Sequence, residues 1–220
     1  MAKAAELRER FRALPKDQIA EHQDFAIRVW RSLSWLERAE STGTDDPEGR
    51  FIFAWIGFNA LYARVDDDHR AWGDREALGA FLAHAWRLDH RGRIRRLLGK
   101  RQLPVLKLIE NKYLSSRFWD HGESAAGHVR KELQQAMARC GTPNMLPVLQ
   151  VLFERLYTMR NQVMHGASTK GSRLNRRTLH GSGSILLELL PEVLEILIDD
   201  GIREDWGRVC YPPDPPSART

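Results

Sequence analysis

One apolar segment limits the folds open to this chain more than any other feature of its sequence. Residues 50–65 are expected to form a helix that is apolar almost all round, and a helix of that kind is buried at the centre of a bundle. The segment is too short to span a membrane, and it contains Asn59. No sustained alternation of polar and apolar residues indicates a strand. We therefore expect an all-α bundle built around this helix.

Further helices are indicated wherever apolar residues recur three or four positions apart. The clearest segments of this kind are residues 4–14, 17–39, 74–88, 124–139, 145–165 and 184–200. Asn144 is expected to cap the helix at 145–165 and Gly166 to end it, before a polar loop at 166–183. Pro191 is expected to kink or divide the last helix.

The composition suggests three parts in a single helical protein. We expect an N-terminal helix at 1–16, a helical domain at 17–205 and a proline-rich, disordered tail at 206–220. The charged N-terminus has no apolar run and is not a signal peptide. The two cysteines form no CxxC pair, which indicates free thiols in a reducing compartment. These features predict a cytoplasmic protein without a membrane segment, and its net charge of +5 weakly favours anionic partners.

The helix predicted at 145–165 separates polar from apolar residues. On a helical wheel, Glu154, Thr158, Asn161 and His165 fall on one line, opposite a wide apolar arc. Arg160 sits inside that arc and needs a partner, because burying an unpaired charge is costly. A structural salt bridge or a guanidinium that extends to solvent would satisfy it as well as a functional role would.

Asn161 and His165 are four residues apart and therefore neighbours on the helix surface. The Asn161 amide could orient the imidazole, although two polar residues near a helix end are also common. Arg160 and His165 project about 140° apart on an ideal helix. The last turn could depart from ideal geometry, Arg160 could reach round, or two subunits could pool their residues.

The segment from Arg160 and Asn161 to His165 resembles the R-x(4–6)-H motif of the HEPN superfamily, including the polar residue directly after the arginine. The segment Phe51 to Ala63 resembles the central helix of bacterial HEPN proteins related to the ApeA group. In outline the resemblance covers residues 20–200. It implies a two-fold dimer in which both motif helices meet in one composite cleft, with Arg160, Asn161 and His165 as catalytic residues.

The resemblance also implies metal-independent cleavage of RNA, often by toxins or antiviral effectors. A nucleotidyltransferase-like antitoxin is a possible partner, and other members of the superfamily are non-catalytic modules that bind RNA or protein. The chemistry suits these residues, because RNA supplies its own nucleophile in the 2′-OH. Histidine can transfer protons near neutral pH, and Arg160 could hold the phosphate. No cofactor is required.

Several other residues are candidates for supporting roles. Four cations follow the motif, and we expect them to bind RNA; the alternative is an ordinary solvated loop. They are Lys170, Arg173, Arg176 and Arg177. Four polar residues could hold the motif residues in position through hydrogen bonds, or could simply be polar groups of the core or of a solvent-exposed face. They are Asn59, Tyr62, Glu154 and Thr158. The dense cations between Arg87 and Arg101 favour a solvated helical face over a track for RNA. The acidic run at 66–68 with His69 lacks the ligand spacing of a metal site.

Overall fold

The apolar segment forms a buried helix, as predicted. A computed structural model of the chain describes residues 3–65, 73–167 and 175–211. Helix α4 (Pro47–Tyr62) begins where the Asp46 carboxylate accepts a hydrogen bond from the backbone N–H of Gly49 at 2.9 Å, with proline in the first turn. Phe51 and Phe58 of α4 are completely buried. The N-terminal cap therefore determines where α4 starts, and the apolar surface of α4 determines that the helix packs in the core.

The described residues are almost entirely helical, which confirms the all-α prediction. In chain order the elements are α1 (Lys3–Arg12), α2 (Lys16–Glu21), α3 (Gln23–Ser41), α4 (Pro47–Tyr62), β1 (Arg64–Val65), α5 (Asp74–Leu88), α6 (Arg93–Lys100), α7 (Gln102–Glu110), the 3-10 helix η1 (Lys112–Leu114), α8 (Ser116–His121), the 3-10 helix η2 (Gly122–Ala125), α9 (Ala126–Arg139), α10 (Leu146–Met164), α11 (Arg176–Asp200) and β2 (Arg208–Val209). Within these ranges no helix is long and apolar enough to cross a membrane.

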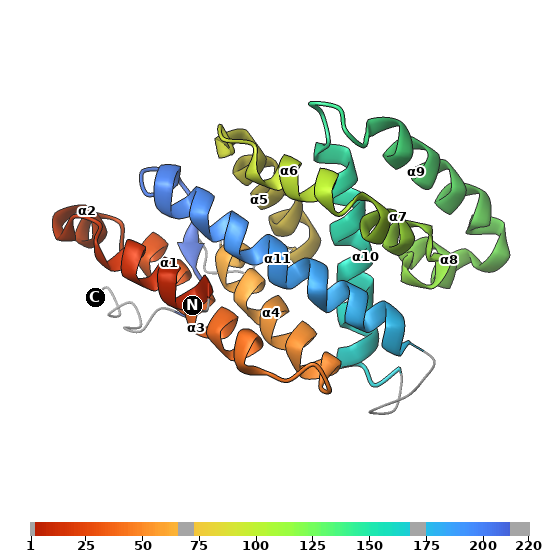
Figure 1. Cartoon of the computed structure of the whole chain (residues 1–220), viewed down its shortest axis with the longest axis horizontal. Helices are drawn as coiled ribbons and strands as arrows, with labels where there is room; N and C mark the ends of the chain where they lie inside the picture. Colours follow the sequence, from red (N-terminus) through yellow and green to blue (C-terminus); the bar gives the residue numbers. More distant parts are fainter. Residues whose placement is uncertain (1–2, 66–72, 168–174, 212–220) are drawn as a thin grey trace, which may run out of the picture.

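Helices α3 and α4 form a hairpin that packs against α11, while α10 packs against α5, α7 and α9 (Figure 1). Gly57 shows how closely α4 approaches its neighbours. A Cβ at this position would lie 2.9 Å from a methyl group of Leu190 on α11 and 3.3 Å from the carbonyl oxygen of Ser32 on α3. A glycine is therefore required where α4 is enclosed between the two other helices.

Helix α11 is longer than predicted, because it begins at Arg176 rather than Ser184. Its first turns contain small residues, and Ser182 and Gly183 are buried. A Cβ at Gly183 would lie 3.6 Å from Phe51, an ordinary van der Waals contact, so this part of α11 lies against α4. The small residues therefore belong to a buried helix rather than to the predicted loop. Pro191 does not divide the helix, because it lies buried in the core inside a continuous α11.

Two other predicted boundaries were wrong. The helix expected at 17–39 is two helices, α2 and α3, which are separated at His22. The N-terminal cap of α10 is Met145 rather than Asn144, and Met145 makes no capping side-chain hydrogen bond.

The start of the predicted tail belongs to the packed fold. Strand β2 pairs antiparallel with β1, so a short strand pair exists where no strand was predicted. Trp206 and Val209 are buried, and the Trp206 indole donates to the carbonyl oxygen of Gly201 at 2.8 Å. The tail expected from residue 206 is therefore ordered as far as Tyr211, and residues 212–220 lie outside the described ranges.

Arg28 of α3 anchors this C-terminal segment from inside the protein. Its guanidinium is completely buried and donates to four carbonyl oxygens, those of Leu61, Ala63, Gly207 and Arg208. Burial lowers the pKa of Arg28 to about 10, which leaves the side chain charged at neutral pH. One buried cation therefore joins α3, the end of α4 and strand β2.

An ion-pair network joins α1 and α6 to the C-terminal half of α11. Arg93 is 8% exposed and lies 3.0 Å from a carboxylate oxygen of Glu195 and 2.6 Å from one of Asp199. Lys3 binds Glu195 at 2.6 Å. Burial raises the pKa of Asp199, but the hydrogen bond and charge of Arg93, together with the charge of Arg10, outweigh it and leave that pKa lowered. The pKa of Glu195 is lowered in the same way, through Lys3 and Arg93.

Candidate functional site

The three predicted catalytic residues lie at the C-terminal end of α10. The Arg160 guanidinium is partly exposed, and its Nη1 donates to Oδ1 of Asn161 at 2.8 Å. His165 is exposed at the C-terminal cap, and Gly166 follows with a φ of 66°, the left-handed conformation that ends many helices. The predicted end of the helix is confirmed. Among the described residues the His165 side chain has no hydrogen-bond partner, so Asn161 binds Arg160 rather than the imidazole.

The Arg160 guanidinium bonds to Asn161, which shares one side of α10 with His165, four residues further on. The same guanidinium lies beside Asp74 and Tyr157, so it also contacts the α5 side of the helix. The three ways in which Arg160 and His165 could act together stay predictions.

Arg160 also belongs to a polar cluster at the start of α5. Its Nη2 lies 3.5 Å from Asp74 Oδ2, and the Tyr62 hydroxyl donates to Asp74 Oδ1 at 2.9 Å. The Arg160 guanidinium carbon lies 5.4 Å from the centre of the Tyr157 ring. Burial, and then the charge and hydrogen bond of Asp74, raise the pKa of Tyr62, so its hydroxyl remains a donor. Tyr62 thus contacts Arg160 indirectly, through Asp74.

The other predicted supporting residues do not reach Arg160. The Ser116 hydroxyl of α8 donates to Glu154 at 3.3 Å, and the buried Thr158 hydroxyl donates to the carbonyl oxygen of Glu154 at 3.1 Å. Glu154 therefore contacts α8 rather than Arg160, and the Thr158 hydroxyl is hydrogen-bonded within its own helix. Asn59 is half-buried, and its side chain makes no hydrogen bond within the described ranges.

Arg155, which was not predicted from the sequence to matter, is more deeply buried than Arg160. Arg155 is completely buried, binds Glu132 of α9 and donates to the carbonyl oxygen of Ile109 at 3.3 Å. Leu152 and Leu156 flank it on α10. A buried charge needs a partner, and this need is greater at Arg155 than at the partly exposed Arg160; the bond to Glu132 holds α9 against α10.

The predicted RNA-binding cations are only partly described. Arg176 and Arg177 are exposed in the first turn of α11, and Lys170 and Arg173 lie outside the described residues. Arg176 donates to the carbonyl oxygen of Asp45 at 3.4 Å, beside the loop that joins α3 to α4. Figure 1 shows the first turns of α11 on the same side of the molecule as the end of α10. The described cations therefore lie on a helix rather than in the loop that was expected.

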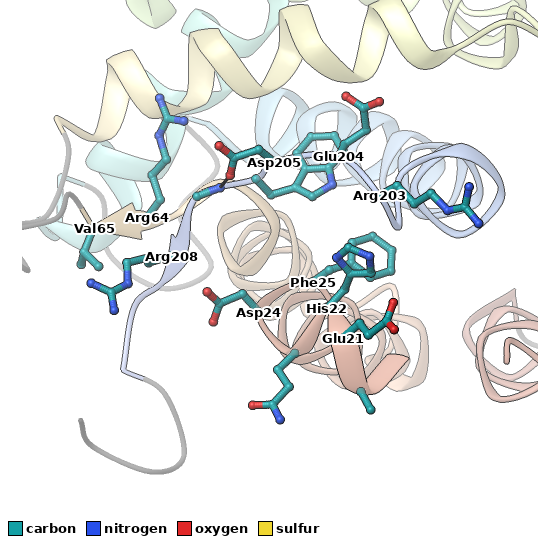
Figure 2. Close-up of a pocket in the computed structure, with 14 residues that line it drawn as sticks. Glu21, His22, Asp24, Phe25, Arg64, Val65, Arg203, Glu204, Asp205 and Arg208 are labelled. Atoms are coloured by element: carbon teal, nitrogen blue, oxygen red, sulfur yellow. Dashed lines mark hydrogen bonds between the residues drawn. The ribbon is translucent and has the colours of Figure 1, made fainter. Parts of the chain in front are cut away.

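A cavity of about 830 Å³ lies away from the motif, between the α2–α3 junction and residues 203–208. Figure 2 shows carboxylates such as Asp24 and Asp205 around it together with Arg64 and Arg208. Its lining includes none of the motif residues. Because both signs of charge line it, the cavity favours neither anions nor cations, and we place the candidate site at the end of α10 instead.

Comparisons with protein-family models, with curated proteins and with solved structures found no match for this chain. In the described parts of the chain, no group of three or more His, Cys, Asp or Glu side chains is placed to hold a metal ion.

Proposed function

We propose that this protein is a HEPN-type endoribonuclease that cleaves RNA without a metal ion and acts as a toxin or an antiviral effector. The observation that carries the proposal is the arrangement at the end of α10, where a guanidinium held by Asn161 lies just over one helical turn before an exposed histidine. A phosphate bound by Arg160 would lie at the same end of α10 as an exposed imidazole that could transfer a proton.

The proposed reaction uses the nucleophile that RNA provides. The 2′-oxygen attacks the adjacent phosphorus as its proton leaves, and the bond from phosphorus to the 5′-oxygen breaks as that oxygen gains a proton. The products are a 2′,3′-cyclic phosphate and a 5′-OH. His165 performs one of the two proton transfers, and Arg160 stabilises the negative charge that develops on the phosphate.

The second proton transfer is one reason to propose a homodimer in which the α10 ends of two subunits share one cleft. The apolar arc of α10 is largely buried in its own chain, so the interface that we propose is confined to the exposed end of the helix. Met164 is the large apolar residue of α10 that stays exposed, at 62%. Mixing Arg160→Ala with His165→Ala protein tests the arrangement. Recovered activity supports a shared cleft, and a monomer in light scattering excludes it.

The direct test is an RNase assay on the purified protein with and without EDTA. We expect cleavage to persist in EDTA and to leave a 2′,3′-cyclic phosphate. His165→Ala is expected to slow it by about 10²–10⁴-fold, the usual contribution of a general acid or base. His90→Ala, which alters an exposed histidine beside α6, is the matched control and should retain the wild-type rate. Cleavage by His165→Ala at the wild-type rate, or its loss in EDTA, would show that the assignment is wrong.

The salt bridge of Arg160 favours a second candidate function. Because Asp74 already neutralises part of its charge, the chain would also suit a non-catalytic HEPN module that binds RNA or a protein partner. RNA binding without cleavage in the same assay would favour this alternative.

A further inference from the structure

A small cavity lies between α5 and α10, next to the proposed catalytic residues. Its volume is about 200 Å³, and Leu78, Leu82 and Phe153 form its apolar walls. Gln150 and Glu154 line it from α10. Pockets for drug-sized ligands measure about 300–1,000 Å³, so this one suits a single planar ring system. We call it the α5–α10 pocket.

The polar groups of the α5–α10 pocket match the edge of a nucleobase. Gln150 is exposed, and its amide, which can both donate and accept, makes no hydrogen bond with any described residue. The Glu154 carboxylate accepts one hydrogen bond from Ser116 and lies 3.3 Å from Arg155, which leaves further acceptor positions. Apolar walls with a few polar groups at one side are the pattern by which proteins enclose an unpaired base.

Two guanidinium groups, one from the pocket and one from the motif, lie at the ring of Tyr157, which lines the pocket. Arg75 lines the pocket and lies 5.1 Å from the centre of the Tyr157 ring, while Arg160 lies 5.4 Å from the same ring. Within the described residues Arg75 forms no ion pair, so its charge is available to an anion. A guanidinium plane can also stack on a base.

The pocket and the motif follow one another along α10. A helix rises 1.5 Å per residue, so Tyr157, Arg160 and His165 lie at successive steps of roughly 4.5 and 7.5 Å along the axis. These steps are of the size that separates a base from its own phosphate and from the next nucleotide. We propose that the α5–α10 pocket holds one unpaired base of the RNA, whose phosphate lies at Arg160. This inference rests on the proposed function for the identity of the ligand, and it restricts the substrate to single strands.

Gly79 provides a sharp test, because it lines the pocket from α5 and a Cβ there would contact nothing within 4 Å. Gly79→Leu keeps the helix, since leucine favours helices more than glycine does, but its side chain would fill the space meant for the base. Gly127→Leu on α9 is the matched control, because Gly127 is also helical and its added Cβ would likewise meet nothing within 4 Å.

The measurement is the fluorescence anisotropy of a 2′-O-methyl single-stranded oligonucleotide, which cannot be cleaved, and of an abasic version of it. Gly79→Leu is expected to weaken binding of the normal oligonucleotide about tenfold or more, the effect of losing one bound base. Gly127→Leu should bind both as the wild type does, and the abasic strand should not distinguish the proteins. Equal affinity of wild type and Gly79→Leu for the normal strand would contradict the proposal that the α5–α10 pocket binds a base.

A second variant keeps the inference testable if Gly79→Leu is unstable. Gln150→Ala removes a hydrogen-bonding group from the pocket and should change the relative affinities for the four homopolymers, whereas an unchanged preference would count against base binding. The two proposals can fail separately. If the wild type cleaves RNA and Gly79→Leu leaves its RNA affinity unchanged, the protein is a nuclease that does not bind a base in this pocket. If Gly79→Leu weakens RNA binding but the wild type does not cleave, the pocket binds a base and the protein is not a nuclease.

Discussion

The two arginine-rich regions of the molecule use their positive charge in different ways. On α6, Arg93 is almost completely buried and is held by two carboxylates of α11. At the end of α10, Arg160 and Asp74 are 27% and 35% exposed and 3.5 Å apart. In the described parts of the chain, Arg176 and Arg177 bind no carboxylate. Arg93 therefore holds helices together, while Arg176 and Arg177 stay exposed without a carboxylate among the described residues and Arg160 has one partly exposed partner. The number of cations in a region does not distinguish these two uses of charge.

The strongest test of this comparison replaces one arginine from each region by alanine. Arg160→Ala is expected to slow RNA cleavage by about 10²–10³-fold, because a charge that stabilises the transition state is lost. It should lower the free energy of unfolding by only about 1 kcal/mol or less, since its ion pair with Asp74 is partly exposed and long, at 3.5 Å. Initial cleavage rates and urea unfolding measure the two effects.

Arg93→Ala should show the opposite pattern. It is expected to lower the free energy of unfolding by about 3 kcal/mol, because Glu195 and Asp199 lose a buried partner. The folded fraction should cleave RNA at the wild-type rate. If Arg93→Ala left stability unchanged while impairing cleavage, the division between the two regions would be wrong.

A second test compares charge reversal in the two regions. The double substitution of Arg176 and Arg177 by glutamate is expected to weaken RNA binding about tenfold and to reduce the salt dependence by about one unit for each lost phosphate contact. Substituting Arg95 and Lys100 on α6 in the same way changes the net charge equally and provides the control, because both are exposed there. Equal losses from the two double variants would assign RNA binding to net charge rather than to the α11 start.

The smallest expected effect is on stability in acid. Asp199 and Glu195 have lowered pKa values in the folded protein. The stability that they contribute is therefore complete above their unfolded pKa values, near about 4, and is lost as the pH falls through the lower folded values. Asp199→Asn should lower stability at pH 7 and flatten its decline below pH 4 in urea unfolding. Asp200→Asn alters an exposed neighbour and should do neither.

The sequence predicted those parts of the fold that depend on local pattern. The apolar character of α4 and the glycine after His165 are visible without a structure, and both predictions hold. Features that depend on distant partners were not predictable. In the sequence Asp74 is an ordinary acidic residue in the first turn of a helix, and only the folded structure shows that it contacts Tyr62 and Arg160. The glycine and serine residues that open α11 indicated a loop because their packing partner, Phe51, is remote in sequence.

The buried guanidinium of Arg28 has a consequence for synthesis of the protein. Two of its four acceptors, the carbonyl oxygens of Gly207 and Arg208, are 179 and 180 residues further along the chain. At a translation rate of 5–20 residues per second, α3 is made roughly 10–35 s before these acceptors exist. During that interval Arg28 can bind only the carbonyl oxygens of Leu61 and Ala63, which are already made. A chain cut just before Gly207 would lack half of the acceptors of this buried cation, and we expect it to be less stable than the full chain.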